Sequence, residues 1–160
     1  MNTRNSARAV MFDPSDRILL FEFVPPKGLI AESPPRFWAT PGGEIEPGED
    51  ARAAVAREVL EETGIQGCEI GAELWFGSNL LTIKGKPTKI LERFFHVRSP
   101  TLTLGATNWT EIEIEVMRAH RWWTVAELLA SKETIFPPRF GYLVERFLKA
   151  DPAGPEEIPL

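Results

Sequence analysis

One stretch decides the fold and the function of this chain, residues 43–65, which read GEIEPGEDARAAVAREVLEETGI. Within it, Ala51, Val55 and Val59 recur at the spacing of an apolar helix face, which predicts a helix over residues 50–63. Acidic residues at its start suit the positive end of the helix dipole, and Gly64 suits the left-handed position that ends a helix. The stretch is therefore predicted to contain one amphipathic helix, which begins near Asp50 and ends before Gly64.

Three glutamates stand near the end of this helix, where stability alone would favour bases. Glu58, Glu61 and Glu62 are spaced i, i+3 and i+4, so they project from one face of the last turn, where the helix dipole disfavours anions. Repulsion between Glu58 and Glu62 adds about 0.2–0.5 kcal/mol. Local rules broken at neighbouring positions are typical of a functional site. A divalent cation would relieve the repulsion, and the competing interpretation is a solvated acidic helix end.

Nearby glycines and an arginine favour the metal interpretation. At Gly42 and Gly43 no Cβ keeps the backbone away from an ion. Arg57 can hold a carboxylate in a bidentate fork, and Glu49 is its natural partner within the stretch. Oxygen ligands at this density suit Mg²⁺ or Mn²⁺, with substrate phosphates and water as the remaining ligands.

These residues, in this order, resemble the Nudix box of the MutT-like hydrolases, G-x₅-E-x₇-R-E-U-x-E-E-x-G-U, in which U is aliphatic. Every specified position is filled, by Gly43, Glu49, Arg57, Glu58, Val59, Glu61, Glu62, Gly64 and Ile65. The resemblance implies a mixed α and β fold (α+β) of the Nudix type, an α/β/α sandwich with a mixed β-sheet between helices. The box covers residues 43–65, and the strand patterns that flank it extend the expected Nudix hydrolase domain over residues 1–150.

The resemblance also implies a reaction, the hydrolysis of a diphosphate linkage in a nucleoside diphosphate joined to another group, X. A nucleoside triphosphate is the first substrate to test, with nucleotide sugars and dinucleotides next. Mg²⁺ is the expected cofactor, Mn²⁺ is an alternative ion, and a small-molecule nucleotide is the expected partner. The alternative function is a non-catalytic Nudix domain that binds a nucleotide as a sensor, although such modules typically lose box glutamates and here all remain.

The resemblance further implies roles for single residues. Glu58 and Glu62 are expected to be the principal metal ligands, and Glu61 a further ligand or the catalytic base. The backbone carbonyl of Gly43 is expected to complete the ligands, while Arg57 orients the glutamates.

An acidic segment outside the box offers further candidates. Glu111, Glu113 and Glu115 alternate with apolar residues, which is typical of a half-exposed strand with solvated glutamates. The resemblance supplies the other interpretation, an acidic residue that acts as general base or extra metal ligand. Glu113 and Glu115 are then the preferred catalytic candidates.

Three other features admit two interpretations each. A basic run is either a solvated turn or an edge that steers phosphate, and it comprises Lys84, Lys86, Lys89 and Arg93. Trp75, Phe76 and Trp109 either pack or stack on a base. The proline-rich loop 25–36 is either a substrate lid or a tolerated insertion.

The remaining patterns place this segment in a wider fold. Strands are expected over residues 7–12, 18–24, 37–40, 68–76 and 89–97, and short helices over residues 125–130 and 140–148. Residues 151–160 contain three prolines and little to pack, so a loosely held tail is expected.

Composition bounds the class of protein. The chain has 160 residues, of which 43% are hydrophobic and 26% charged, as expected of one globular domain. No apolar run approaches the roughly 18 residues of a membrane helix, and Cys68 is the single cysteine, so we expect a cytoplasmic protein without disulfides. Residues 44–62 hold seven acids and two bases, which accounts for the whole net charge of −5. A broad nucleic-acid surface is therefore not expected, and a homodimer is left open.

Overall fold

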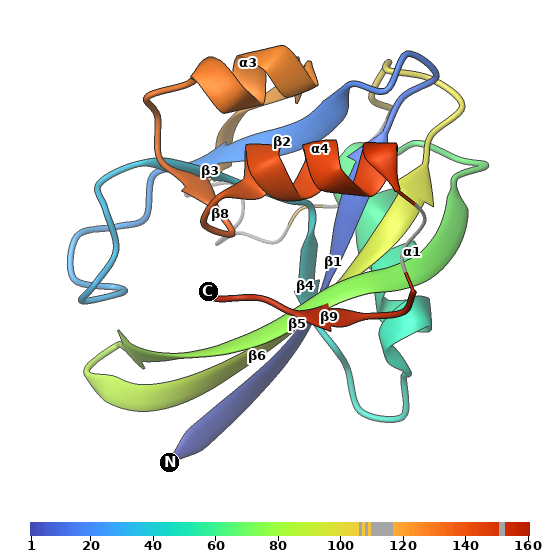
Figure 1. The fold of residues 1–160 in the computed structure, drawn as a ribbon. Helices are drawn as coiled ribbons and strands as arrows, with labels where there is room; N and C mark the ends of the chain where they lie inside the picture. Colours follow the sequence, from blue (N-terminus) through green and yellow to red (C-terminus); the bar gives the residue numbers. More distant parts are fainter. Residues whose placement is uncertain (106, 108, 110–116, 151–152) are drawn as a thin grey trace.

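The computed structural model describes residues 1–105, 107, 109, 117–150 and 153–160 (Figure 1). Its helices are α1 (Ala51–Thr63), α3 (Val125–Ala130) and α4 (Phe140–Lys149). Its strands are β1 (Asn2–Phe12), β2 (Ile18–Phe23), β3 (Phe37–Ala39), β4 (Gly42–Glu44), β5 (Glu69–Ile83), β6 (Lys86–Arg98), β7 (Met117–Trp123), β8 (Ile135–Phe136) and β9 (Glu156–Glu157). Among the described residues, no helix has the length and apolar character that crossing a bilayer requires.

Strand β1 organises a mixed sheet whose described strands run in the order β8-β3-β2-β1-β6-β5-β9, with β7 beside β2. One edge of β1 pairs in parallel with β6 along its whole length. The other edge pairs with β2 at Phe12 and with β4 at Ser6–Arg8, both antiparallel. Because β4 contains the first residues of the Nudix box, this pairing sets the start of the box beside Arg8.

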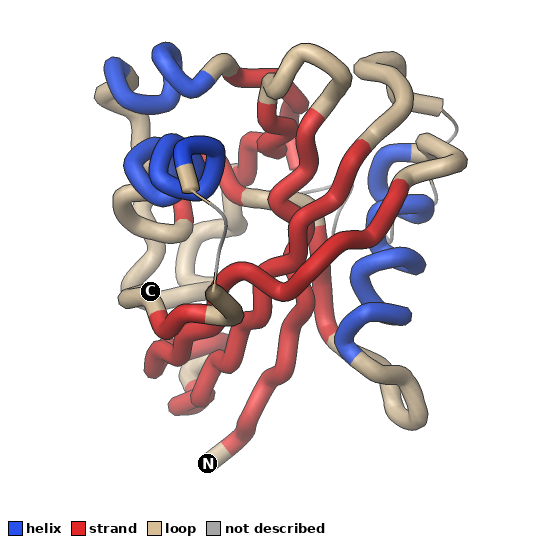
Figure 2. Tube along the Cα trace, turned by 45° about the vertical axis from the view of Figure 1, so that its right-hand side comes forward, coloured by secondary structure: helices blue, strands red, loops and turns tan. Residues whose placement is uncertain are grey.

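Helices lie on both faces of the sheet, with α1 on one side and α3 and α4 on the other (Figure 2). Alternation along β1 explains the two layers, since successive side chains of a strand point to opposite faces. Ala9 and Met11 pack in the cluster that includes α1, whereas Val10 and Phe12 pack in the cluster that includes α4. The predicted mixed fold with a sheet between helices is confirmed.

Strand β5 extends further than the sequence predicts. The residues after Phe76 are Gly77, Ser78 and Asn79, which favour a turn, yet pairing with β6 carries the strand on to Ile83. The hairpin then turns through two residues with positive φ, Lys84 at 50° and Gly85 at 75°, as a tight two-residue turn requires. The partner strand β6 therefore sets where β5 ends.

The C-terminal residues 153–160 also differ from the expectation of a loosely held tail. Strand β9 pairs in parallel with β5, and the amide of Ile158 donates to the carbonyl of Phe76 at 2.9 Å. The Ile158 side chain is only 4% exposed and belongs to the cluster beneath α4. Ile158 and Leu160 therefore both pack against this cluster, in a segment whose composition predicted little packing.

Candidate active site

Helix α1 places two of the box glutamates on its buried face. Asp50 begins the helix, its carboxylate accepting from the amide of Ala53 at 2.7 Å, and Gly64 ends it with φ 67°. The helix packs on the sheet through an apolar stripe that includes Val55. Glu58 and Glu62 share this stripe and are 9% and 2% exposed. The i, i+4 spacing therefore directs both carboxylates toward the sheet.

The Glu62 carboxylate reaches the first strand of the box. Its Oε1 accepts from the amide of Gly42 at 3.3 Å. The backbone carbonyl of Glu62 accepts from the indole Nε1 of Trp109 at 2.9 Å, and Trp109 packs partly buried against the cluster beneath α1. Trp109 therefore supports the end of the box helix, which accords with the packing interpretation of this aromatic residue.

The Glu58 carboxylate lies against the backbone of Gly43. A Cβ at Gly43 would stand 2.6 Å from Glu58 Oε1 and 2.8 Å from its Cδ, closer than atoms can pack. Glycine at this position therefore leaves room that the carboxylate occupies. The same close approach brings the main chain of Gly43 beside the oxygens of Glu58.

Arg57 connects the acidic residues of the box. Its Nε and Nη2 donate to the two oxygens of Glu49 at 2.8 and 2.9 Å, which confirms the predicted bidentate pair. Its Nη1 donates to Glu58 at 2.9 Å and to Glu61 at 3.2 Å, and Nη2 also donates to the carbonyl of Glu44 at 3.0 Å. One guanidinium thus orients carboxylates from both the loop and the helix.

These contacts shift the protonation equilibria of both partners. Hydrogen bonds from Arg57, with a further one from the amide of Glu46, lower the pKa of Glu49 to about 2. The same pair raises the pKa of Arg57, chiefly through the hydrogen bonds to Glu49 and then to Glu58. The Arg57–Glu49 pair therefore stays ionised across the neutral range.

Glu61 differs from the other two helix glutamates because its side chain is 36% exposed. Within the described ranges, no three acidic, histidine or cysteine side chains converge closely enough to enclose an ion by themselves. The three helix glutamates therefore comprise two buried carboxylates, Glu58 and Glu62, and one outer carboxylate, Glu61. Arg57 contacts Glu58 and Glu61. Glu113 and Glu115, together with Glu111, lie outside the described residues.

Arg8 is a site residue that the sequence analysis missed. It projects from β1 toward the box, and its Nη1 donates to the carbonyls of Thr40 and Gly42, both at 3.3 Å. Its Nε donates to Glu92 Oε1 on β6 at 3.0 Å. Burial alone would lower the pKa of Arg8, but the charges of Glu92, Glu62 and Glu58 raise it overall. The sequence feature that could have indicated Arg8 is its charge, because Arg8 is the one charged residue in the apolar run of residues 7–12.

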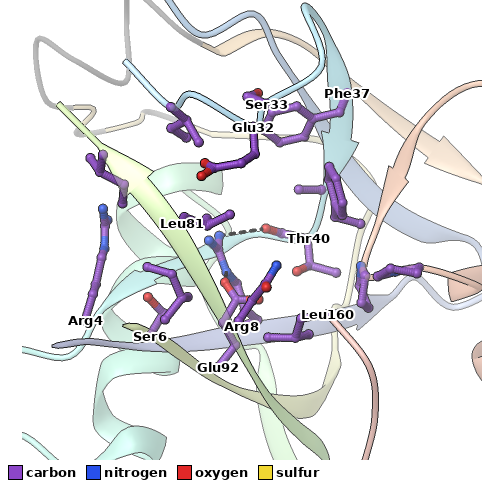
Figure 3. A pocket seen from close by; sticks show the side chains of 18 of the residues that line it. Arg4, Ser6, Arg8, Glu32, Ser33, Phe37, Thr40, Leu81, Glu92 and Leu160 are labelled. Carbon is purple, nitrogen blue, oxygen red and sulfur yellow. Dashed lines mark hydrogen bonds and ion pairs between the residues drawn. The ribbon is translucent and has the colours of Figure 1, made fainter. Parts of the chain in front are cut away.

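A cavity of about 390 Å³ opens on the face of the sheet opposite α1 (Figure 3). Arg8 and Glu92 lie at its base, and Glu32 and Ser33 of the loop 25–36 border it on another side. Hydrogen bonds hold this loop to β5, from Thr82 N to Glu32 Oε2 at 2.9 Å and from Ala31 N to the carbonyl of Thr82 at 3.0 Å. The loop therefore forms one wall of the cavity.

The remaining candidates lie elsewhere. Trp75 is buried in the core beneath α4, and Phe76 is exposed. The lysines of the basic run are exposed on and beside the β5–β6 hairpin, and Arg93 pairs with Glu73. Cys68 is half-buried against the cluster beneath α1, and burial raises the pKa of its thiol.

Known proteins resemble this chain in sequence and in fold. A stretch of 39 residues is 54% identical to the Arabidopsis thaliana protein Nudix hydrolase 26, chloroplastic, and it spans 24% of this chain and 18% of that relative. The solved structure of a MutT protein from Methanosarcina mazei Go1 aligns with a TM-score of 0.67 at 22% identity, covering 92% of this chain and 94% of that one. An ADP-ribose pyrophosphatase from Streptococcus suis 89-1591 aligns with a TM-score of 0.60 at 14% identity, covering 97% and 98%.

At these identities the solved structures establish the shared fold. The family assignment rests on a longer match, since the model of the NUDIX domain matches residues 2–145. This match includes the complete box and the strands that carry Arg8 and Glu92. The chain therefore belongs to the NUDIX domain family.

Proposed function

We propose that this chain is a hydrolase that uses a divalent metal ion to cleave a diphosphate linkage in a nucleoside diphosphate joined to a group X. The observation that carries the proposal is the arrangement of Arg57, which holds Glu49, Glu58 and Glu61 with one guanidinium. Crowding anions at the end of a helix destabilises that helix. Such locally unfavourable arrangements are typical of functional sites. Family membership supports the same conclusion.

The residues fit a hard divalent cation. All candidate ligands are oxygens, and the close approach of Gly43 to Glu58 puts a main-chain group and a carboxylate side by side. Mg²⁺ is usually held by one or two carboxylates together with substrate phosphates, rather than by a complete protein cage. Two buried carboxylates and one main-chain group therefore fit Mg²⁺ or Mn²⁺ as an ion whose remaining ligands would come from the substrate and water.

Each box residue has a proposed role that follows from its burial. Glu58 and Glu62 are buried and would hold the ion with the Gly43 carbonyl. Glu61 is more exposed and would be either a further ligand or the base that takes a proton from water. Arg57 is a positioning residue, because it contacts the glutamates. Glu113 and Glu115 are alternative bases.

The reaction is the attack of water on phosphorus. A bond forms between the water oxygen and phosphorus, the bridging P–O bond breaks, and the water proton passes to a carboxylate. The bound metal would supply charge neutralisation at the phosphates and a lower pKa for the attacking water. The protein then contributes positioning and fixed charges.

A substrate panel tests this function. Nucleoside triphosphates, nucleotide sugars, dinucleotides and ADP-ribose are incubated with Mg²⁺ or Mn²⁺, and the products are separated. ADP-ribose is included because the Streptococcus suis protein of the same fold is described as an ADP-ribose pyrophosphatase. We expect cleavage of at least one anhydride, abolished by EDTA. No cleavage in the panel, with nucleotide binding retained, would instead support the sensor function.

A further inference from the structure

Contacts from β1 hold the chain at the entrance of the box, where strand pairing is interrupted. Pro41, which lies between β3 and β4, has no amide hydrogen and cannot donate to a neighbouring strand. Its own carbonyl accepts from the amide of Ala9 at 2.8 Å. The carbonyl of Thr40 accepts from Nη1 of Arg8 at 3.3 Å (Figure 3), and the carbonyl of Gly42 accepts from the same nitrogen at the same distance. One side chain of β1 therefore bridges the residues before and after the proline.

Glu92 fixes the direction of the Arg8 side chain. Its Oε1 accepts from Arg8 Nε at 3.0 Å, across the neighbouring strands β1 and β6. The two side chains are only 21% and 17% exposed, so water competes with this ion pair less than it would at the surface. The guanidinium is planar and rigid, so a contact at Nε also sets the direction of Nη1. Arg8 and Glu92 therefore act as one unit.

This unit acts in two ways on the two buried carboxylates of the box, Glu58 and Glu62. Through the backbone, Gly42 is held at its carbonyl by Arg8 and donates from its amide to Glu62 Oε1 at 3.3 Å. Through charge, burial opposes the charged form of Arg8, yet the charges of Glu92 and of both buried carboxylates raise its pKa overall. The guanidinium is therefore within electrostatic reach of both carboxylates, and it offsets part of the repulsion between them.

We propose that Arg8, oriented by Glu92, is a positioning residue that keeps the metal ligands of the box in place when no ion is bound. The inference rests on the proposed function, because it takes Glu58, Glu62 and the Gly43 carbonyl as those ligands. The Gly43 carbonyl belongs to the residue that follows the segment held by Arg8, so a shift of that segment would displace it. Ligands that are already in place lose less conformational freedom when an ion binds, so this unit raises the metal affinity.

The charge of Arg8 by itself would act in the opposite direction, because a cation near the carboxylates repels a second cation. Metal affinity therefore distinguishes positioning from a charge effect. Removing Arg8 alone would strand the Glu92 charge, so the test variant is R8M/E92Q, which leaves the net charge unchanged. R8K is the second variant, because lysine keeps the charge but lacks the rigid fork that contacts Glu92 and two carbonyls together.

Binding of Mn²⁺ to the nucleotide-free protein tests this role without catalysis, and electron paramagnetic resonance of the free ion gives the bound fraction. We expect the Kd for Mn²⁺ to rise about tenfold or more in R8M/E92Q and by a smaller factor in R8K. R93M/E73Q is the matched control, because it removes a bidentate ion pair of the same sheet outside the box, again without changing the net charge. The control should bind Mn²⁺ as the wild type does. Thermal unfolding in EDTA checks that each variant is folded.

The outcomes separate this inference from the proposed function. Wild-type affinity or tighter binding in R8K or in R8M/E92Q would overturn the positioning role, as would an equal loss of affinity in R93M/E73Q. The absence of Mn²⁺ binding by the nucleotide-free wild type would overturn it too. Hydrolysis in the substrate panel alongside any of these results leaves the proposed function standing. Conversely, a loss of Mn²⁺ affinity confined to the Arg8 variants, with no hydrolysis of any substrate, supports the positioning role and overturns the proposed activity.

Discussion

Arg8 and Glu62 contact opposite ends of the same residue, Gly42. The Nη1 of Arg8 donates to the Gly42 carbonyl, and the Gly42 amide donates to Glu62 Oε1, both at 3.3 Å. Gly42 has φ 146°, and a Cβ there would lie 2.3 Å from the carbonyl oxygen of Ala7, so only glycine fits between the strands. The position of the buried Glu62 carboxylate therefore depends on β1 as well as on the box, because Gly42 hydrogen-bonds to both Glu62 and Arg8.

The fork of Arg57 predicts a loss of activity in a substitution that keeps the charge. Arg57→Lys cannot hold Glu49 in a bidentate pair while also contacting Glu58 and Glu61. We expect kcat on the best panel substrate to fall about 10- to 100-fold with little change in KM. Arg93→Lys is the matched control, because Arg93 forms a bidentate pair with Glu73 outside the box. Equal losses in both variants would contradict the positioning role.

The low pKa of Glu49 predicts a pH-dependent contribution to stability. Its pKa is about 2 in the folded chain and 4.5 in an unperturbed carboxyl, so the ionised form is favoured by folding. This contribution is full above pH 4.5 and is lost as the pH falls toward 2. Urea unfolding should therefore show wild type more stable than Glu49→Gln above pH 4.5, with the difference shrinking at lower pH. The exposed control Glu69→Gln should show no such trend.

The close approach at Gly43 predicts that a single methyl group disturbs the site. Gly43→Ala would push the Glu58 carboxylate away, because the new Cβ stands 2.6 Å from its Oε1. Since the end of the Glu58 side chain can move, we expect the fold to survive and kcat to fall at least about tenfold. Gly48→Ala is the control in the same loop. A Cβ at Gly48 would meet open space, so this variant changes a glycine of the loop without touching Glu58. Full activity in G43A would show that Glu58 is misassigned.

The buried end of the chain predicts a cost for truncating Ile158. Ile158→Ala removes a 4% exposed side chain from the cluster beneath α4 and should lower the free energy of unfolding by about 2 kcal/mol or more. Glu157→Ala is the control, because Glu157 is the exposed last residue of β9 and immediately precedes Ile158. Chemical denaturation measures both values. A negligible change in the Ile158 variant would mean that the tail does not stabilise the domain.

The box helix was predictable because its signals are local. The apolar stripe, the acidic start and Gly64 lie within a few residues of the bonds they form, and the helix bounds agree with the structure. The Arg57–Glu49 pair was also predictable, since the two residues are eight positions apart and the helix fixes their direction. Burial of the Glu58 and Glu62 face follows from the same spacing.

Arg8 and the C-terminal strand were not predictable in this way, because their partners are distant in sequence. Arg8 contacts Glu92, 84 positions away, and that contact depends on the parallel register of β1 and β6. Similarly, nothing local in residues 153–160 indicates pairing with β5. That pairing accompanies the packing of Ile158 into the apolar cluster beneath α4, whose members are distant in sequence. Register and long-range burial are therefore what the sequence patterns left undetermined.

The most direct measurement of the central claim is the metal-dependent hydrolysis rate of Glu62→Gln, in which a buried carboxylate becomes a neutral amide of the same shape. We predict that wild type cleaves its best panel substrate only with Mg²⁺ or Mn²⁺, and that E62Q loses at least about 100-fold in kcat while its circular dichroism spectrum is unchanged. Glu69→Gln, an exposed glutamate at the start of β5, should keep wild-type turnover. Wild-type turnover by E62Q would contradict the assignment of the box carboxylates as the metal site.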